Sequence, residues 1–117
     1  MNMNKLNIAL IWHMHQPLYK DRLSNSYLMP WVRLHGIKDY LDMALLLEKF
    51  PNISQTFNLV PSLIEQIEDY ATGEASDPYW KLSKIPVYKL SVLEKAKILE
   101  LFFDLNWEKM IYKFPRY

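Results

Sequence analysis

Apolar residues occur in short runs separated by prolines and polar segments, and their spacing predicts alternating strands and helices. Residues 6–12 are apolar at nearly every position, and Pro17 follows. Such a run is typical of a strand that is buried on both faces in a parallel sheet. Residues 53–58 alternate between apolar and polar and predict a second strand. Two strands joined by a helix form a βαβ unit, so the pattern predicts an α/β fold.

Three longer segments have helical spacing of their apolar residues. Residues 33–50 carry a wide apolar stripe, and Pro51 ends it because proline disfavours helical geometry in the residue before it. Residues 61–73 predict a helix with proline at its first position and glycine at its stop. A third helix is predicted from Ser91 to about residue 104, since Ser91 and Glu94 form a capping-box pattern.

The remaining segments have weaker signals. Residues 18–29 show no periodicity and are predicted to form a loop, which is long for a connection between a strand and a helix. Asp77-Pro78 suggests a turn or the start of a short helix, and residues 106–112 suggest one more helical segment. Two parallel strands cannot cover their own edges, so we expect residues 1–117 to be an unfinished part of a larger domain.

Composition narrows the class of protein. The 117 residues are 50% hydrophobic and 15% aromatic, which supports a folded core, and the formal net charge of +1 gives no sign of a nucleic-acid-binding surface. No apolar run is long enough to cross a membrane. The absence of cysteine excludes disulfides and thiolate metal sites. We expect a soluble protein of the cytoplasm that needs no cofactor.

The most informative polar residues follow the first predicted strand. His13 and His15 are separated by one residue, so strand geometry directs both side chains to the same side. Gln16 adds an amide at the same place, and Pro17 stiffens the exit. Two imidazoles there can bind a ligand, transfer protons or bind a metal. Equally, they can be partly buried histidines that hydrogen-bond to backbone carbonyls.

Three further residues are candidates for the same site. Asn58 ends the second strand, where it either presents its amide or caps the next helix. Trp31 either forms a wall of a pocket or anchors the preceding loop. His35 makes a three-histidine metal site conceivable, because a metal needs a third ligand. The His-x-His pair is also similar to that of metal-dependent amidohydrolases, although their usual preceding aspartate is absent.

Carboxylates are not found where the strands end. Cleavage of a glycosidic bond by general acid and base requires two carboxylates that face it. The candidate acids lie on predicted helices, where Gln66 also falls on the polar side. We expect a solvated helix face for these acids: Asp39, Asp42, Glu65, Glu68 and Asp69. The chain therefore offers no catalytic pair.

At His13-Met14-His15-Gln16-Pro17 the chain resembles glycoside hydrolase family 57, whose first signature region contains His-Gln-Pro. The resemblance covers nearly the whole chain and extends to Pro115-Arg116-Tyr117. Its other segments are Pro30-Trp31-Val32-Arg33-Leu34-His35, Lys38-Asp39-Tyr40 and Phe57-Asn58-Leu59-Val60-Pro61-Ser62-Leu63.

The resemblance implies the amino-terminal portion of an incomplete seven-stranded (β/α) barrel that acts on α-glucans with retention of configuration. Activities of the family include α-amylase, amylopullulanase, 4-α-glucanotransferase, α-galactosidase and branching enzyme. Its glutamate nucleophile and aspartate acid/base belong to later signature regions, and no segment here matches them. The resemblance implies that His15 and His13 lie near the subsite that holds the scissile bond and that Gln16 and Pro17 shape its rim, while Trp31 and His35 carry over less directly.

Three functional hypotheses follow. The first is a truncated, inactive part of an α-glucan-active enzyme, whose partners are an α-glucan and the rest of the barrel. The second is a non-catalytic glucan-binding or complementing module. The third is a metal-dependent hydrolase that uses His13 and His15.

Overall fold

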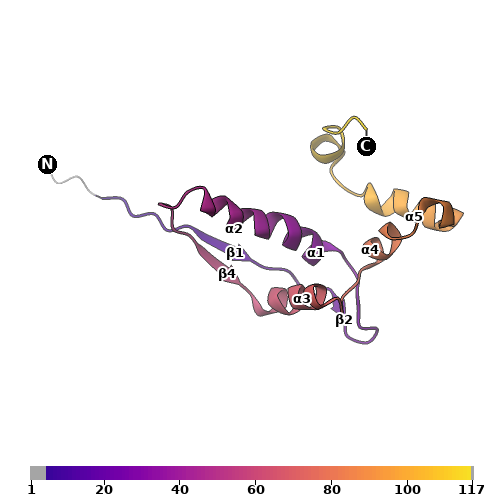
Figure 1. Cartoon of the computed structure of the whole chain (residues 1–117), viewed down its shortest axis with the longest axis horizontal. Coiled ribbons are helices and arrows are strands. Elements are labelled where there is room, and N and C mark those ends of the chain that lie inside the picture. Colours follow the sequence, from indigo (N-terminus) through magenta and orange to yellow (C-terminus); the bar gives the residue numbers. More distant parts are fainter. Residues whose placement is uncertain (1–4, 117) are drawn as a thin grey trace.

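A strand–helix–strand unit forms one part of the molecule, which a computed structural model describes over residues 5–116 (Figure 1). Strands β1 (Ile11–Met14) and β4 (Thr56–Leu59) are hydrogen-bonded neighbours and run parallel. Between them the chain forms a continuous helical segment made of α1 (Trp31–His35), a π-helical turn (Gly36–Tyr40) and α2 (Leu41–Glu48). The parallel pair with its connecting helices confirms the predicted α/β class.

The first strand lies nearer to the histidines than the sequence predicts. The prediction covers residues 6–12, whereas β1 begins at Ile11 and includes His13. Its ladder with β4 begins where the amide of Thr56 donates to the carbonyl of Leu10 at 3.0 Å. Among residues 5–116, the segment before this point has no neighbouring strand, so its apolar residues alone do not make it a strand.

The connection after β1 contains an antiparallel ribbon where the sequence predicts a loop. Strand β2 (Lys20–Asp21) pairs with β3 (Ser26–Tyr27). The carboxylate of Asp21 accepts hydrogen bonds from the backbone and the hydroxyl of Ser24. Asn25 has a positive φ of 49°, which asparagine tolerates better than most residues. These turn residues form the ribbon without any hydrophobic periodicity, so a search for periodicity overlooks it.

Helix α3 (Pro61–Thr72) follows β4 directly and confirms the second predicted helix. Pro61 stands at its first position, where the missing amide hydrogen is not needed. Gly73 ends it with a φ of 81°, a left-handed conformation that glycine adopts without a steric penalty. The helix packs against α1.

The carboxyl-terminal part consists of short helices that extend away from the strand pair (Figure 1). Asp77 caps the first of them, since its side chain accepts a hydrogen bond from the amide of Trp80 at 2.8 Å. Ser91 and Glu94 form the predicted capping box. The elements of this part are α4 (Pro78–Ser83), a 3-10 turn (Val87–Lys89), α5 (Val92–Phe102) and a π-helical turn (Trp107–Ile111).

The core is small and lies at the carboxyl end of β1. Met14, Val32 and Leu63 are buried together, one each from β1, α1 and α3. In contrast, Ile11 is 67% exposed and Trp12 is 41% exposed, so the prediction of a strand buried on both faces is wrong for this chain. The strand has only one neighbour among the described residues, and little chain packs over its amino-terminal half.

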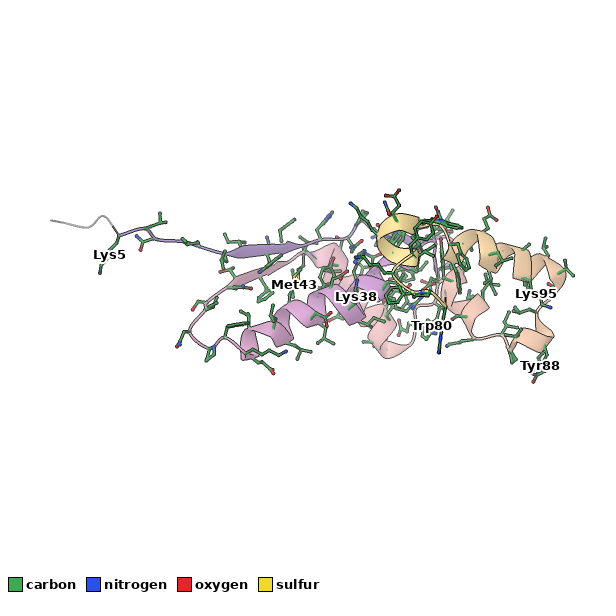
Figure 2. The ribbon with its side chains drawn as sticks, turned by 90° about the horizontal axis from the view of Figure 1, so that it is seen from above. Lys5, Lys38, Met43, Trp80, Tyr88 and Lys95 are labelled. Atoms are coloured by element: carbon green, nitrogen blue, oxygen red, sulfur yellow. The ribbon has the colours of Figure 1, made fainter. Side chains whose placement is uncertain are left out.

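The molecule is elongated, with extents of 74 × 40 × 21 Å. Its radius of gyration is 19.4 Å, whereas a compact domain of this length has about 13 Å. Figure 2 shows Lys5 at one end and Lys95 and Tyr88 at the other. Such a shape leaves much apolar surface uncovered, and Val92 and Leu93 of α5 are at least 80% exposed.

Candidate functional site

Two histidines and an asparagine lie together at the carboxyl ends of the parallel strands. His13 of β1 is the partner of Asn58 of β4 in the strand register, so their side chains leave the same face of the sheet. The rings of His13 and His15 are stacked, with centroids 5.9 Å apart and planes inclined by 15°. All three residues are exposed. They form a polar edge that a ligand in solution can reach.

Gln16 continues this edge and is held from two sides. Its side-chain Nε2 donates to the hydroxyl of Tyr40 at 3.0 Å, and its backbone carbonyl accepts from the hydroxyl of Ser62 at 3.0 Å. The same Tyr40 hydroxyl donates to the carbonyl of His15 at 3.2 Å. Residues from the helical segment and from α3 thus fix the chain as it leaves β1. Sequence reasoning did not single out Tyr40, although the segment Lys38-Asp39-Tyr40 contributed to the family resemblance.

The ring of His35 lies beside those of Tyr40 and Trp31, which belong to the same helical segment. The ring of His35 is 6.3 Å from that of Tyr40 and 6.1 Å from that of Trp31. The Nδ1 of His35 forms a hydrogen bond with the carboxylate of Asp39. This bond, together with Lys38 nearby, lowers the pKa of Asp39. Asp39 is therefore paired rather than simply solvated as the sequence predicted.

The six candidate residues thus form two groups. His13, His15 and Asn58 make the polar edge, and Gln16 is linked through Tyr40 to His35 and Trp31. Trp31 also lines a hollow of about 580 Å3 between α1, α4 and the carboxyl-terminal segment. Other residues that line it include Leu34, Tyr79, Phe102 and Met110.

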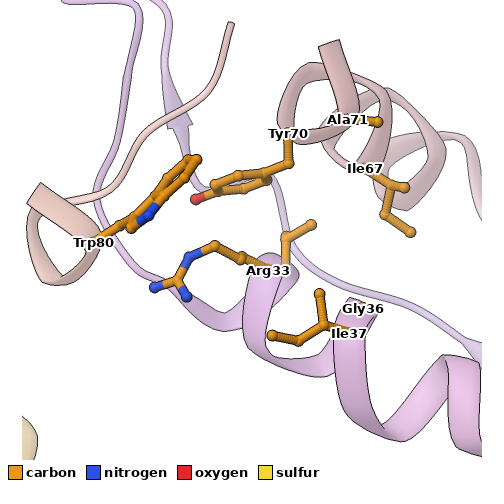
Figure 3. A pocket seen from close by; sticks show the side chains of 8 residues that line it. Arg33, Gly36, Ile37, Ile67, Tyr70, Ala71 and Trp80 are labelled. Carbon is orange, nitrogen blue, oxygen red and sulfur yellow. The ribbon is translucent and has the colours of Figure 1, made fainter. Parts of the chain in front are cut away.

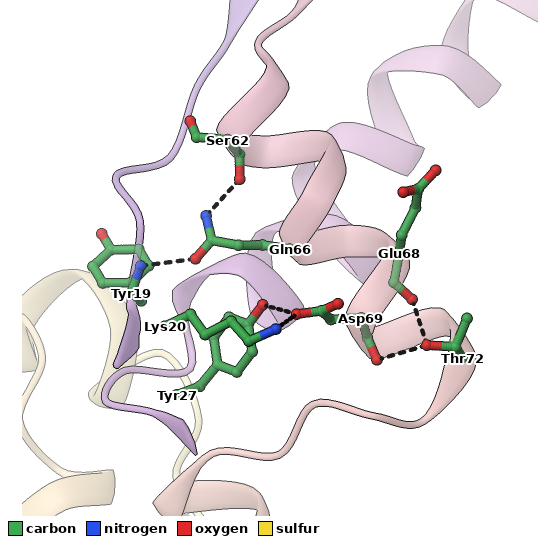
Figure 4. Close-up of polar contacts among 8 residues, drawn as sticks. All are labelled: Tyr19, Lys20, Tyr27, Ser62, Gln66, Glu68, Asp69 and Thr72. Carbon is green, nitrogen blue, oxygen red and sulfur yellow. Dashed lines mark hydrogen bonds and ion pairs between the residues drawn. The ribbon is translucent and has the colours of Figure 1, made fainter. Parts of the chain in front are cut away.

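A buried glutamine supports the segment that follows Gln16. The Nε2 of Gln66 donates to the carbonyl of Pro17 at 2.9 Å. It also donates to the carbonyl of Ser62 at 2.7 Å, and its Oε1 accepts from the amide of Tyr19 at 2.8 Å (Figure 4). Gln66 is 0% exposed, although the sequence pattern places it on the polar side of the helix. The backbone groups after Pro17 need partners, and Gln66 supplies both a donor and an acceptor.

Asp69, on the same helix, also departs from the prediction of a solvated face. The carboxylate of Asp69 accepts from Lys20 at 2.6 Å and from the hydroxyl of Tyr27 at 2.8 Å (Figure 4). The hydrogen bond from Lys20, followed by that from Tyr27, lowers the pKa of Asp69. Asp69 therefore fastens the β2–β3 ribbon to α3 instead of facing solvent alone.

A buried carboxylate, that of Asp77, joins three helices. Asp77 is 0% exposed and accepts from Arg33 Nε at 2.9 Å and from the Tyr70 hydroxyl at 3.1 Å. The guanidinium of Arg33 lies 5.6 Å from the ring centre of Trp80, as a cation–π contact requires. Figure 3 shows Arg33, Tyr70 and Trp80 converging on one hollow of about 360 Å3. Its other walls include Ile37, Ile67 and Ala71.

The three-histidine metal site has no support. Among residues 5–116, no group of three or more His, Cys, Asp or Glu side chains is placed to hold a metal ion. His35 is instead bonded to Asp39, while His13 and His15 stack on each other.

This arrangement defines a class of protein. In α/β barrel enzymes the ligand binds at the edge formed by the carboxyl ends of the parallel strands, which is where His13, His15 and Asn58 lie. The family model for glycosyl hydrolase family 57 matches residues 9–113. The chain belongs to glycosyl hydrolase family 57, and its α/β structure agrees with part of the (β/α)7 barrel of that family.

Membership implies glycoside hydrolase or glucanotransferase chemistry and a carbohydrate substrate. Comparison with curated proteins and with solved structures gave no match. No helix in residues 5–116 has the length and apolar character needed to cross a membrane.

Proposed function

We propose that this chain supplies one wall of the substrate cleft in a retaining enzyme that acts on α-glucans such as starch, glycogen or maltooligosaccharides. The observation that carries the proposal is the edge formed by His13, His15 and Asn58 in a member of family 57. Imidazole and amide groups can both donate to and accept from sugar hydroxyls. Trp31 adds an aromatic face on which a sugar ring can stack.

Titration with sugars of matched length tests this proposal. We expect maltohexaose, which has α-linked glucose units, to shift the nuclear magnetic resonance signals of His13 and His15 in a saturable way. Cellohexaose, which has β linkages, is the matched control and should shift them little. The double variant His13→Ala/His15→Ala should lose binding, whereas Tyr88→Ala, which removes an exposed aromatic far from the edge, should retain it. The proposal would be refuted if the folded wild-type chain did not bind maltohexaose.

The chain alone should be inactive on glucans. A retaining mechanism needs two carboxyl groups about 5–5.5 Å apart across the scissile bond. At the candidate site, the carboxylate of Asp39 is bonded to His35 and is not paired with a second acid. We therefore expect no reducing sugar to appear from soluble starch. Activity of the purified chain, free of contaminating enzyme, would contradict this view.

The proposal also treats the chain as the first part of a barrel that is completed by further sequence. The coding sequence that follows codon 117 tests this point directly. The remaining signature regions of the family, in the same frame or a shifted one, would support it. An unrelated continuation, together with maltohexaose binding, would favour the non-catalytic binding module.

A further inference from the structure

The hydrogen bonds of Tyr40 fix the orientation of the Gln16 side chain. A tyrosine hydroxyl has a single proton to donate. Tyr40 donates it to the backbone carbonyl of His15, 3.2 Å away, which can only accept. Toward Gln16, 3.0 Å away, the same hydroxyl can then only accept, so the amide must turn its NH2 group inward. Its Oε1 is left without a hydrogen bond to any residue in 5–116. Gln16 therefore presents an acceptor to the candidate site.

The preceding residue, Asp39, acts on His35 in a similar way. The lowered pKa of Asp39 keeps its carboxylate ionised near neutral pH, and an ionised carboxylate only accepts hydrogen bonds. The proton of the bond between them therefore resides on Nδ1 of His35. In the neutral ring, Nε2 then carries a lone pair and is also an acceptor.

The π-helical turn carries both of these residues. Gly36–Tyr40 interrupts the regular α-helical pattern between α1 and α2, and such turns occur often at functional sites. Asp39 reaches back to His35 on its own helix, while Tyr40 reaches across to the chain that leaves β1. Two consecutive residues thus orient two polar side chains that come from different elements.

We propose that Tyr40 and Asp39 are positioning residues that set the hydrogen-bonding polarity of the candidate site. Through them, Gln16 Oε1 and, in the neutral ring, His35 Nε2 become acceptors for hydroxyl groups of the bound sugar. The choice of sugar as the ligand rests on the proposed function, whereas the orientation of the two side chains does not.

Two variants test the positioning without any ligand. In Tyr40→Phe, which removes one oxygen, we expect faster hydrogen exchange and a shifted resonance for the side-chain amide of Gln16. In Asp39→Asn, we expect the 15N shifts of His35 to move from the Nδ1–H tautomer toward the Nε2–H tautomer. The matched control is Tyr27→Phe, which removes a tyrosine hydroxyl bonded to Asp69 and should change neither signal. Urea unfolding of each variant shows that it is folded.

The same variants are then titrated with maltohexaose. We expect Tyr40→Phe to bind about fivefold more weakly than wild type, as loss of one ordered hydrogen bond predicts, and Tyr27→Phe to bind like wild type. An unchanged Gln16 amide in Tyr40→Phe, or an Nε2–H tautomer of His35 in the wild type, would overturn the inference. If both spectroscopic changes occur but wild type binds no maltohexaose, the positioning stands and the proposed function fails.

Discussion

The two ends of the parallel strand pair differ in how well the rest of the chain covers them. At the carboxyl end, Met14 is 5% exposed and contacts Val32 and Leu63, and the buried Gln66 hydrogen-bonds to the chain just beyond. At the amino end, Ile11 of the same strand is 67% exposed. Tertiary stability is therefore concentrated beside the candidate site, and this difference can be tested by substitution.

The largest effect is expected at Asp77, which joins α1, α3 and α4. Asp77→Ala should lower the free energy of unfolding by about 3–5 kcal/mol, because it removes a buried carboxylate and leaves the guanidinium of Arg33 without its partner. Urea denaturation followed by circular dichroism measures this. Asp42→Ala, an exposed substitution on α2, is the control and should change the value by less than about 0.5 kcal/mol. Equal effects of both variants would contradict the importance of this joint.

Leu63 tests the apolar side of the same region. Leu63→Ala should cost about 3 kcal/mol, since it opens a cavity at a residue that is 0% exposed. Leu93→Ala removes the same atoms from an exposed position on α5, where the side chain is 80% exposed. Chemical denaturation should find almost no change for it. A comparable loss at both leucines would mean that α5 is covered in solution.

The capping box tests the carboxyl-terminal helices separately. Ser91→Ala removes the hydroxyl that accepts from the amide of Glu94, and such a loss costs about 1 kcal/mol of helix stability. Because the main contacts of α5 are with α4, far-ultraviolet circular dichroism should fall while the unfolding midpoint of the core stays nearly the same. Ser54→Ala, at an exposed position before β4, serves as the control. A shifted midpoint would show that α5 and the core unfold together.

Acid should weaken the link between the β2–β3 ribbon and α3. The pKa of Asp69 lies below its ordinary value of 3.8 in the folded chain, mainly because Lys20 donates to it. Its contribution to stability is complete above the unfolded-state pKa and is lost as pH falls toward the folded-state pKa. Asp69→Asn should therefore reduce the loss of melting temperature between about pH 6 and pH 3. If it leaves this loss unchanged, other acids determine the response; Glu65→Gln, an exposed change on α3, is the control.

Local signals in the sequence predict the helix boundaries well. Pro61 and Gly73 delimit α3 because one residue has no amide hydrogen to lose and the other adopts a positive φ. Ser91 and Glu94 mark the start of α5 for a similarly local reason. The order His13, Gln16 and Asn58 also predicts where polar groups gather, since strand ends collect at one edge of a parallel sheet.

Local sequence patterns could not identify the polar side chains that hold this edge in place. The sequence pattern places Gln66 on the polar side of a helix, yet its partners Pro17 and Tyr19 lie more than 45 residues away in the sequence. Asp77 and Tyr40 likewise bond to residues distant in sequence. Whether a polar side chain is solvated or buried depends on such partners, which periodicity does not encode.

The π-helical turn at Gly36–Tyr40 has a consequence for chain length. Such a turn accommodates one residue more than regular α-helical winding would. Because the turn already absorbs the extra residue, deleting one residue within it should restore regular winding and leave the flanking segments close to their present orientation. The same deletion within α2 would rotate everything on one side of it by about 100° relative to the other. The chain should therefore tolerate a change of one residue in length better at this turn than in the regular helix beside it.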